Sequence, residues 1–420
     1  MVSLAQSRYL HLVYDDVDLG RNCRSCDLLS SNDRPMHDAW VHRPFVEAQP
    51  NVVIHSVADR PERYAYPIGC FHEPQQWGGP PIRTWTPRGP DAGPLMYVPD
   101  TVMHDARQGR VLFIMDQSQE SYSDTLLWDW FYDHAARHGI APCQMLYLTA
   151  DQFAESRHAA WADQRAVTQR MQVISTVFNQ YTWPYDRMVG GDYGPSMDSV
   201  QQGWQATGIK AYNCLNREPR PHRRWFFARL LEEDLLRHGL VSMNGFDRLP
   251  DLPSGRSWSE HTVSAVLGSV PRVVDRSDFH NNMYHDVNES IYQQTLFSVI
   301  TDTHIGDANM LIGEKQFKPI WCGHPFLLFG TAGTLACMRR MGYETFPMLW
   351  DESYDDMEDP EARMEAIIQQ IHHAVSQPDP LAWISQALPA LVHNHHRLRQ
   401  SWEDGRDCRC ILDILRGFMA

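Results

Sequence analysis

The chain has 420 residues, of which 43% are hydrophobic and 21% charged, and its formal net charge is −15. This composition is typical of a globular protein with roughly two or three domains. The acidic charge disfavours broad, nonspecific binding of nucleic acids. No apolar run approaches the roughly 20 residues of a membrane span, and the first twenty residues lack the apolar core of a signal peptide. We therefore expect a cytoplasmic protein.

The nine cysteines indicate reduced thiols, because their number is odd and no secretory signal precedes them. Cys23 and Cys26 form one close pair, and Cys408 and Cys410 form the other. Four thiolates could bind zinc. The two pairs lie at opposite ends of the chain, however, and neither has the spacing of paired zinc knuckles, which favours buried free thiols. We expect no metal site.

The first 105 residues are predicted to be irregular, apart from one strand at 51–56. Residues 74–94 are rich in proline and glycine, which predicts a long surface loop. This loop contains Trp77 and Trp85, so it could be a binding loop in which the aromatic rings stack on a ligand. The alternative is that both tryptophans pack into the core.

Alternating strands and helices begin at Val111 and resume after a glycine-containing segment at 186–206. This alternation is typical of parallel sheets covered by helices. In the first half we expect strands at 111–115, 145–149 and 173–178, a helix at 124–138 and a helical segment from 151. In the second half we expect strands at 212–215, 240–243, 296–300 and 326–329, and helices at 221–238, 334–341, 361–376, 381–388 and 391–402.

The predicted fold is therefore α/β, with two Rossmann-like halves joined by the segment 186–206 as a linker or hinge. We place one domain at 1–190 and the second at 206–385. Further helices at 386–420 are expected to pack back on the body of the protein.

Three arginines, Arg217, Arg220 and Arg223, lie between a predicted strand and the next helix. In open α/β sheets ligands bind at this edge, and arginine forks match phosphate oxygens. Cations at a helix N-terminus oppose the helix dipole, so the cluster predicts a bound anion. The alternative is a solvated helix start, paired with Glu232 and Glu233 further along the helix.

The segment from Gly313 places a carboxylate, Glu314, beside a cation, Lys315. Adjacent residues do not share a helix face, so we expect Glu314 to reach a ribose and Lys315 to reach the phosphates of one nucleotide. Pro319 is expected to stop or kink the short helix that begins here. The alternative is an ordinary surface ion pair.

A glycine-rich turn follows the predicted strand at 326–329. Backbone N–H groups in such a turn can face phosphate oxygens. Gly330, Gly333 and Thr334 are therefore predicted to bind the same nucleotide.

Carboxylates also follow predicted strands. Asp302 stands where it could bind a sugar or ribose hydroxyl, orient a cation, or cap a helix. Asp116 and Glu120 follow the first strong strand, where a carboxylate could act as a general base or form a turn. Asp16 and Asp18 have the spacing of a metal-binding Asp-x-Asp pair, but they lie too near the N-terminus to follow a nucleotide-binding half.

Residues 211–360 resemble a group of glycosyltransferases found in phage and bacterial genomes. The Glu-Lys segment is also similar to the donor-site motif of family-10 fucosyltransferases. This sequence has Asp302 where the group has Glu, and Gln316 where the group has Thr. The matching residues are 214–217, 219–220, 222–223, 314–315, 317–320, 324–326, 342–346 and 350–356.

The resemblance implies a GT-B architecture, in which two Rossmann-like domains face each other across a central cleft. The N-terminal domain would then hold the acceptor and the C-terminal domain a nucleotide-diphosphate sugar. The implied reaction inverts the anomeric carbon and requires no metal or other cofactor. The implied assignments are Arg217, Arg220, Arg223 and Lys315 for the diphosphate, Glu314 for the ribose, and Asp116 or Glu120 for the general base.

The resemblance leaves open the nucleotide of the donor and the chemical class of the acceptor. The donor is linked to UDP or GDP, and the acceptor is a glycan or a hydroxymethylated pyrimidine in phage DNA, in the cytoplasm of the host. The acidic net charge weighs against DNA, and the phage-like resemblance weighs for it. A DNA base would be flipped into the cleft, with Trp77 and Trp85 as a stacking wall. A non-catalytic protein that binds nucleotide sugars or carbohydrates is the alternative from another class.

Overall fold

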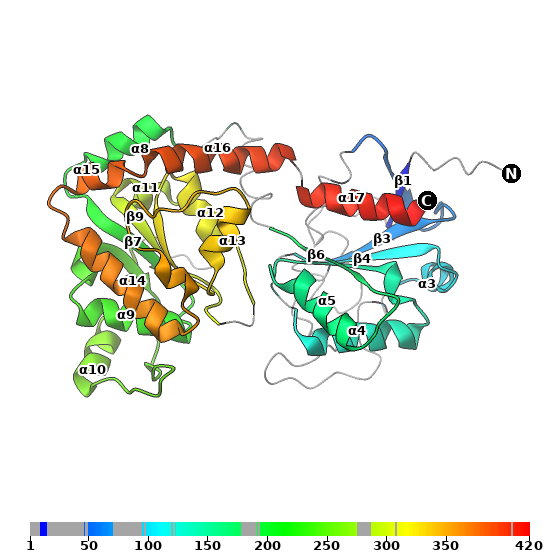
Figure 1. The fold of residues 1–420 in the computed structure, drawn as a ribbon, viewed down its shortest axis with the longest axis horizontal. Coiled ribbons are helices and arrows are strands. Elements are labelled where there is room, and N and C mark those ends of the chain that lie inside the picture. Colours follow the sequence, from blue (N-terminus) through cyan, green and yellow to red (C-terminus); the bar gives the residue numbers. More distant parts are fainter. Residues whose placement is uncertain are drawn as a thin grey trace. The chain divides into compact units, whose positions relative to one another are not determined.

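The structure is a computed structural model. It describes residues 9–14, 46, 49–69, 95, 98–118, 121, 123–177, 191, 194–274, 287–306, 309–404 and 406–420. The chain divides into two compact units, and Figure 1 shows the elements of each. Unit 1 comprises the described residues within 1–178, 309–311 and 404–420, and unit 2 comprises those within 179–308 and 312–403. Among the described helices, none combines the length and apolar character needed to cross a lipid bilayer.

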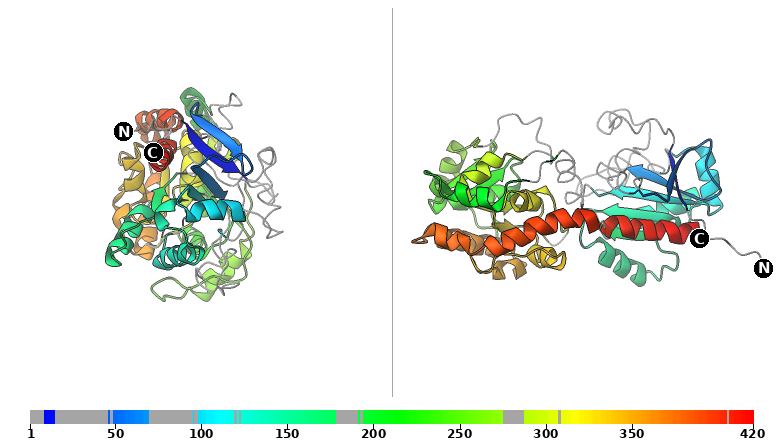
Figure 2. Two further views of the ribbon diagram at one scale, coloured as in Figure 1. Left: turned by 90° about the vertical axis from the view of Figure 1, so that its right-hand side faces the viewer. Right: turned by 90° about the horizontal axis from the view of Figure 1, so that it is seen from above.

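Unit 1 is built on one parallel sheet in the order β2-β1-β3-β4-β5-β6. Residues of β4 alternate between two cores, because successive side chains of a strand point to opposite faces. Phe113 packs with residues of α3, α4 and α5 on one face, and Ile114 packs with residues of α17 on the other. Figure 1 shows α17 on one side of this sheet and α4 and α5 on the other, and Figure 2 gives two further views of the same ribbon. The elements are β1 (Leu10–Tyr14), β2 (Val52–Ser56), β3 (Tyr64–Gly69), α3 (Asp100–Arg107), β4 (Val111–Gln117), α4 (Thr125–His138), η5 (Pro142–Gln144), β5 (Met145–Thr149), α5 (Ala154–Gln164), β6 (Gln172–Ser175) and α17 (Arg406–Met419).

Unit 2 has a second parallel sheet, in the order β10-β9-β7-β8. Its strands are β7 (Lys210–Asn216), β8 (Gly239–Met243), β9 (Thr295–Thr301) and β10 (Phe326–Phe329). Its helices are α8 (Met197–Trp204), α9 (Pro221–Glu232), η6 (Leu236–His238), α10 (Glu260–Gly268), α11 (Glu289–Gln293), α12 (Glu314–Trp321), α13 (Thr334–Arg340), η8 (Ser353–Asp356), α14 (Pro360–Val375), α15 (Pro380–Ser385) and α16 (Leu388–Asp404). The two sheets confirm the predicted α/β class with two Rossmann-like domains.

Two parts of the chain differ from their prediction. Residues before 105 were expected to be irregular apart from one strand, but they also form β1, β3 and the start of α3. Pro67 lies inside β3, and a proline argues against a strand when only the sequence is considered. The expected linker at 186–206 contains α8, whose Val200 and Trp204 are buried. The predicted domain bounds of 1–190, 206–385 and 386–420 remain predictions.

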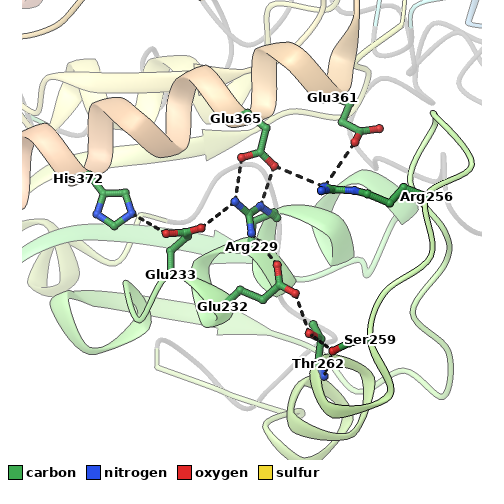
Figure 3. Close-up of polar contacts among 9 residues, drawn as sticks. All are labelled: Arg229, Glu232, Glu233, Arg256, Ser259, Thr262, Glu361, Glu365 and His372. Atoms are coloured by element: carbon green, nitrogen blue, oxygen red, sulfur yellow. Dashed lines mark hydrogen bonds and ion pairs between the residues drawn. The ribbon is translucent and has the colours of Figure 1, made fainter.

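A polar network holds the C-terminal end of α9 against α14 (Figure 3). Arg229 of α9 forms a bidentate pair with Glu365 of α14, with N···O distances of 2.7 and 2.9 Å. The same guanidinium donates to Glu232 and Glu233, and Glu233 also lies 3.2 Å from His372. Bidentate arginine pairs fix geometry as well as adding energy. The network therefore keeps α9 in place against its neighbour.

Candidate donor site at the carboxyl edge of the unit 2 sheet

Three neighbouring parallel strands of unit 2 each end at a predicted site residue. Arg217 directly follows β7, Asp302 follows β9, and Gly330 follows β10. Because these strands are adjacent and parallel, their carboxyl ends meet at one edge. This is the edge at which open α/β sheets bind ligands. We call it the carboxyl edge.

Two of the predicted cations are distant in the sequence, but both donate hydrogen bonds to Thr303 at the carboxyl edge. Arg220, the residue before α9, donates to the Thr303 carbonyl at 3.3 Å. Lys315, in the first turn of α12, donates through Nζ to the Thr303 hydroxyl at 3.0 Å. Both side chains are only partly buried. The structure therefore brings together the arginine cluster and the Glu-Lys segment, as the sequence predicted.

Arg223 lies in the same place, but it is buried and bonded to the protein itself. One guanidinium nitrogen donates to the Glu218 carbonyl at 3.0 Å, and another donates to the Asp302 carbonyl at 3.1 Å. Only 4% of Arg223 is exposed. Sequence reasoning predicted a phosphate ligand here, whereas the structure uses these donors to hold the turn after β9.

His222 supports the same turn and was not predicted as a site residue. Its Nε2 donates to the Asp302 carbonyl at 2.9 Å. Burial and the positive charges of Arg223 and Arg220 lower the pKa of His222 to about 3, although the bond to Asp302 acts in the opposite direction. The imidazole is therefore neutral at pH 7 and acts as a donor. A histidine between two arginines at a helix start was the available signal in the sequence.

The local charges favour a bound anion. Glu232 and Glu233, the alternative partners for the arginine cluster, are engaged by Arg229 in the network of Figure 3. The buried Nε groups of Arg220 and Arg223 have no hydrogen-bond partner among the described residues. Burial and the positive charge of Arg220 lower the pKa of Arg223. The carboxylates of Asp302 and Glu314 act against this shift, and a bound anion would relieve the repulsion between the two arginines further.

Glu314 and Lys315 contact each other in the structure. Lys315 Nζ lies 3.4 Å from a Glu314 oxygen, and about a quarter of each side chain is exposed. Burial opposes the ionisation of Glu314, but Lys315 and Lys318 outweigh it and lower its pKa to about 2. This contact is the ion pair that the alternative interpretation expected. The separate ribose and phosphate roles of the two residues stay a prediction. Helix α12 also continues through Pro319 to Trp321, where we expected a stop or kink.

Asp302 is buried, and both of its carboxylate oxygens are bonded to the protein. The Thr303 N–H donates to Oδ1 at 2.6 Å, and Gln316 Nε2 donates to Oδ2 at 2.7 Å. Burial raises the pKa of Asp302, and Lys315 and these hydrogen bonds act against the rise. Asp302 caps no helix. It connects the end of β9 with α12.

The glycine turn after β10 faces a carboxylate of the chain itself. Asp355 accepts from the Leu335 and Ala336 N–H groups at 3.0 Å each, and its carbonyl accepts from Gly333 at 2.7 Å. Gly333 has a φ of 79°, which favours glycine. The Thr334 N–H and hydroxyl both donate to the Thr331 carbonyl. Asp355 thus stands where the sequence predicted a phosphate.

Gly330, the third residue predicted in this turn, lies beside Asp302. A Cβ at Gly330 would lie 3.4 Å from the Asp302 carboxylate. The turn from Gly330 to Thr334 is therefore corrected from a phosphate-binding loop to a loop that packs against two carboxylates of the protein.

The role of Asp355 leads to a prediction of stability. We expect Asp355→Ala to lower the free energy of unfolding by about 2 kcal/mol, because two buried N–H groups would lose their acceptor. Urea unfolding of purified protein measures this change. Asp356→Ala is the matched control, since the neighbouring Asp356 is exposed. Equal effects of the two substitutions would contradict the assignment.

The predicted general base in unit 1 has a local partner. Asp116 lies in β4 and is 1% exposed. Its Oδ1 accepts from the Ser118 N–H at 2.8 Å and from the Ser118 hydroxyl. This is the turn that the alternative interpretation expected. Glu120, Trp77 and Trp85 lie outside the described residues.

A second buried carboxylate in unit 1, Asp151, was missed by sequence reasoning. It follows β5 and accepts from the Met310 and Phe153 N–H groups at 2.9 and 3.1 Å. The Ser123 hydroxyl also donates to it. Met310 belongs to the short segment 309–311 that packs with unit 1. The signal in the sequence was an aspartate two residues after the predicted strand at 145–149.

No metal centre is evident in the described part of the chain, where no three His, Cys, Asp or Glu side chains are placed to share an ion. Cys214, Cys322 and Cys337 are buried, and Cys143 and Cys410 are exposed.

Comparison with known proteins gives no family. No family model matches the chain, and no curated protein matches it. Among solved structures, it is similar to an α,α-trehalose-phosphate synthase (UDP-forming) from Burkholderia vietnamiensis, with 10% identity and a TM-score of 0.42 over 74% of this chain and 70% of that one. A trehalose 6-phosphate synthase from Burkholderia multivorans has 11% identity and a TM-score of 0.39 over 75% and 69%. A further trehalose-6-phosphate synthase has 8% identity and a TM-score of 0.38 over 94% and 98%. Similarity at these values shows no activity for this chain.

Proposed function

We propose that the chain is a glycosyltransferase of the GT-B type that uses a nucleotide-diphosphate sugar, and that unit 2 binds this donor at the carboxyl edge. One observation carries the proposal: Arg220, Arg223 and Lys315 converge on the turn formed by Asp302 and Thr303. A diphosphate is the anion that suits such a cluster, because arginine and lysine match its oxygens in charge and geometry. The sequence resemblance over residues 211–360 supports the same choice.

The proposed roles differ from residue to residue. Arg217, Arg220 and Lys315 contact the diphosphate, and Glu314 binds the ribose. Arg223 positions the turn that the other cations share. As the glycosidic bond breaks, negative charge develops on the β-phosphate, and preorganised cations stabilise it more than they stabilise the bound substrate. The reaction requires no metal in this proposal.

The proposed binding site for the acceptor is in unit 1, within the predicted domain 1–190. Inversion at the anomeric carbon requires a base on the acceptor hydroxyl. Asp116 or Glu120 is proposed for this role, and Trp77 and Trp85 for contact with the acceptor. The acceptor is a glycan or a hydroxymethylated pyrimidine in DNA.

A screen of nucleotide sugars tests the proposal. We expect one UDP- or GDP-sugar to raise the melting temperature by several degrees at saturating concentration, since a ligand that binds only the folded state stabilises it by mass action. Mass spectrometry of the products of slow hydrolysis then identifies the sugar and the nucleotide. Absence of any shift or hydrolysis across the panel would overturn the proposal.

Two further outcomes separate the alternatives. Donor binding without hydrolysis or transfer would indicate the non-catalytic carbohydrate-binding protein. With the donor known, glycosylation is measured on DNA containing hydroxymethylcytosine, on ordinary DNA of the same sequence, and on a panel of glycans. Transfer only to the first substrate supports the DNA acceptor, and transfer to a glycan supports the other.

A further inference from the structure

Asp302 and Gln316 form a buried pair that joins two elements of the proposed donor site. Asp302 follows β9 and is 3% exposed, whereas Gln316 lies in the first turn of α12 and is fully buried. Gln316 Nε2 donates to Asp302 Oδ2 at 2.7 Å, and Gln316 Oε1 accepts from the Gly313 N–H at 3.0 Å. One side chain thus bridges the end of the strand and the start of the helix.

The orientation of the Gln316 amide follows from its partners. The Gly313 N–H can only donate, so it must face the amide oxygen. The amide nitrogen is then left for Asp302, which accepts as a carboxylate. If the amide were rotated by half a turn, both of its hydrogen bonds, to Gly313 and to Asp302, would be lost. The pair therefore specifies one spacing between β9 and α12.

That spacing matters for the cations on either side of it. Lys315 is the neighbour of Gln316, Thr303 is the neighbour of Asp302, and Lys315 Nζ donates to the Thr303 hydroxyl at 3.0 Å. Arg220 donates to the Thr303 carbonyl. Each oxygen of the Asp302 carboxylate already accepts one hydrogen bond from the protein, and only 3% of the residue is exposed, so burial limits direct contact with a ligand.

We propose that Asp302 and Gln316 are positioning residues of the donor site, which set Lys315 and Arg220 at the distance required by one diphosphate. The sequence left open whether Asp302 binds a sugar or ribose hydroxyl, orients a cation or caps a helix; the geometry points to a role in orienting the cations through Gln316. This inference rests on the proposed function of the carboxyl edge.

Exchange of the two side chains tests the proposal. In Asp302→Asn, the new amide nitrogen must face one of two donors, Gln316 Nε2 or the Thr303 N–H. In Gln316→Glu, two carboxylates face each other. We expect each single variant to weaken donor binding at least about tenfold, because a buried polar group loses its partner. In the double variant, the amide introduced at position 302 can donate to the carboxylate introduced at position 316, and that carboxylate can still accept from Gly313. We expect the donor affinity of the double variant to return to within about threefold of the wild type, since the two changes compensate each other.

Two substitutions at exposed positions serve as controls. Asp356→Asn and Gln205→Glu change the same functional groups at exposed positions of unit 2 and are expected to leave affinity unchanged. Circular dichroism and melting temperature show that each variant is folded. A double variant no better than Asp302→Asn would overturn the positioning role and indicate direct contact between Asp302 and the donor. If the wild-type protein binds no donor, the proposed function fails first, and this role fails with it.

Discussion

Lys315→Ala is expected to reduce turnover of the nucleotide sugar at least about 100-fold, and to remove the rise in melting temperature that the sugar produces. The reason is electrostatic. Removal of one preorganised charge or donor from developing negative charge costs on the order of 10²- to 10³-fold in rate. Lys315 is accessible to a ligand, because 27% of its side chain is exposed. Its Nζ donates to the Thr303 hydroxyl, so the charge already lies at the carboxyl edge.

The matched control is Lys210→Ala. Lys210 begins β7, at the opposite end of the strand from Arg217, and its Nζ donates to the Arg237 carbonyl at 2.9 Å. We expect this variant to keep both turnover and ligand-induced stabilisation. Lys315→Arg retains the charge but changes its geometry, so we expect partial activity. Wild-type turnover in Lys315→Ala would place the diphosphate elsewhere.

Acidification below pH 6.5 is expected to destabilise both units steeply. Four histidines are buried with lowered pKa values, mainly because burial disfavours the charged ring: about 3 for His134 and His222, and about 4 for His158 and His324. His134 and His158 belong to unit 1, and the other two belong to unit 2.

The sign of the effect follows from the direction of these shifts. Each histidine is neutral when folded and gains a proton near pH 6.5 when unfolded, so the unfolded state binds more protons as the pH falls. Above pH 6.5 each histidine is neutral in both states and leaves the free energy of unfolding unchanged. As the pH falls from 6.5 to the folded pKa, each histidine lowers the free energy of unfolding by up to about 1.4 kcal/mol per pH unit. Calorimetry from pH 7.5 to 4.5 measures the decline.

One variant isolates a single histidine. His324 Nε2 donates to the Tyr292 carbonyl at 2.7 Å, and His324→Gln can retain this donor without a titrating group. We expect the acid dependence of unit 2 to become shallower by about 1.4 kcal/mol per pH unit. His373→Gln, at an exposed position of α14, is the control and should keep the wild-type slope. An unchanged slope in His324→Gln would show that this ring is not neutral in the fold.

Local signals in the sequence predicted elements well where the chain itself marks their ends. The apolar run Phe326–Phe329 is bounded by Pro325 and Gly330, and the structure has β10 at those residues. Helix α4 begins after Asp124, which accepts from the Leu127 N–H at 2.7 Å, and ends at Gly139 in the left-handed region. In contrast, β1 and β3 are short strands whose burial depends on neighbours far along the chain, and both were missed.

The sequence by itself determined the α/β class, most strand positions of unit 2, and the cations that could gather after them, because apolar periodicity and helix starts are properties of a few consecutive residues. Only the tertiary structure decided which partner each side chain takes. Arg223 donates to the Asp302 carbonyl, and Gln316 donates to the Asp302 carboxylate. The Asp355 carboxylate accepts from the Leu335 N–H after β10. These partners lie 14 to 79 residues apart. Arg223 meets Asp302 because β7 lies beside β9 in the sheet although β8 comes between them in the chain, and no local pattern encodes that order. The other two contacts depend on how α12 and the segment around Asp355 pack after their strands.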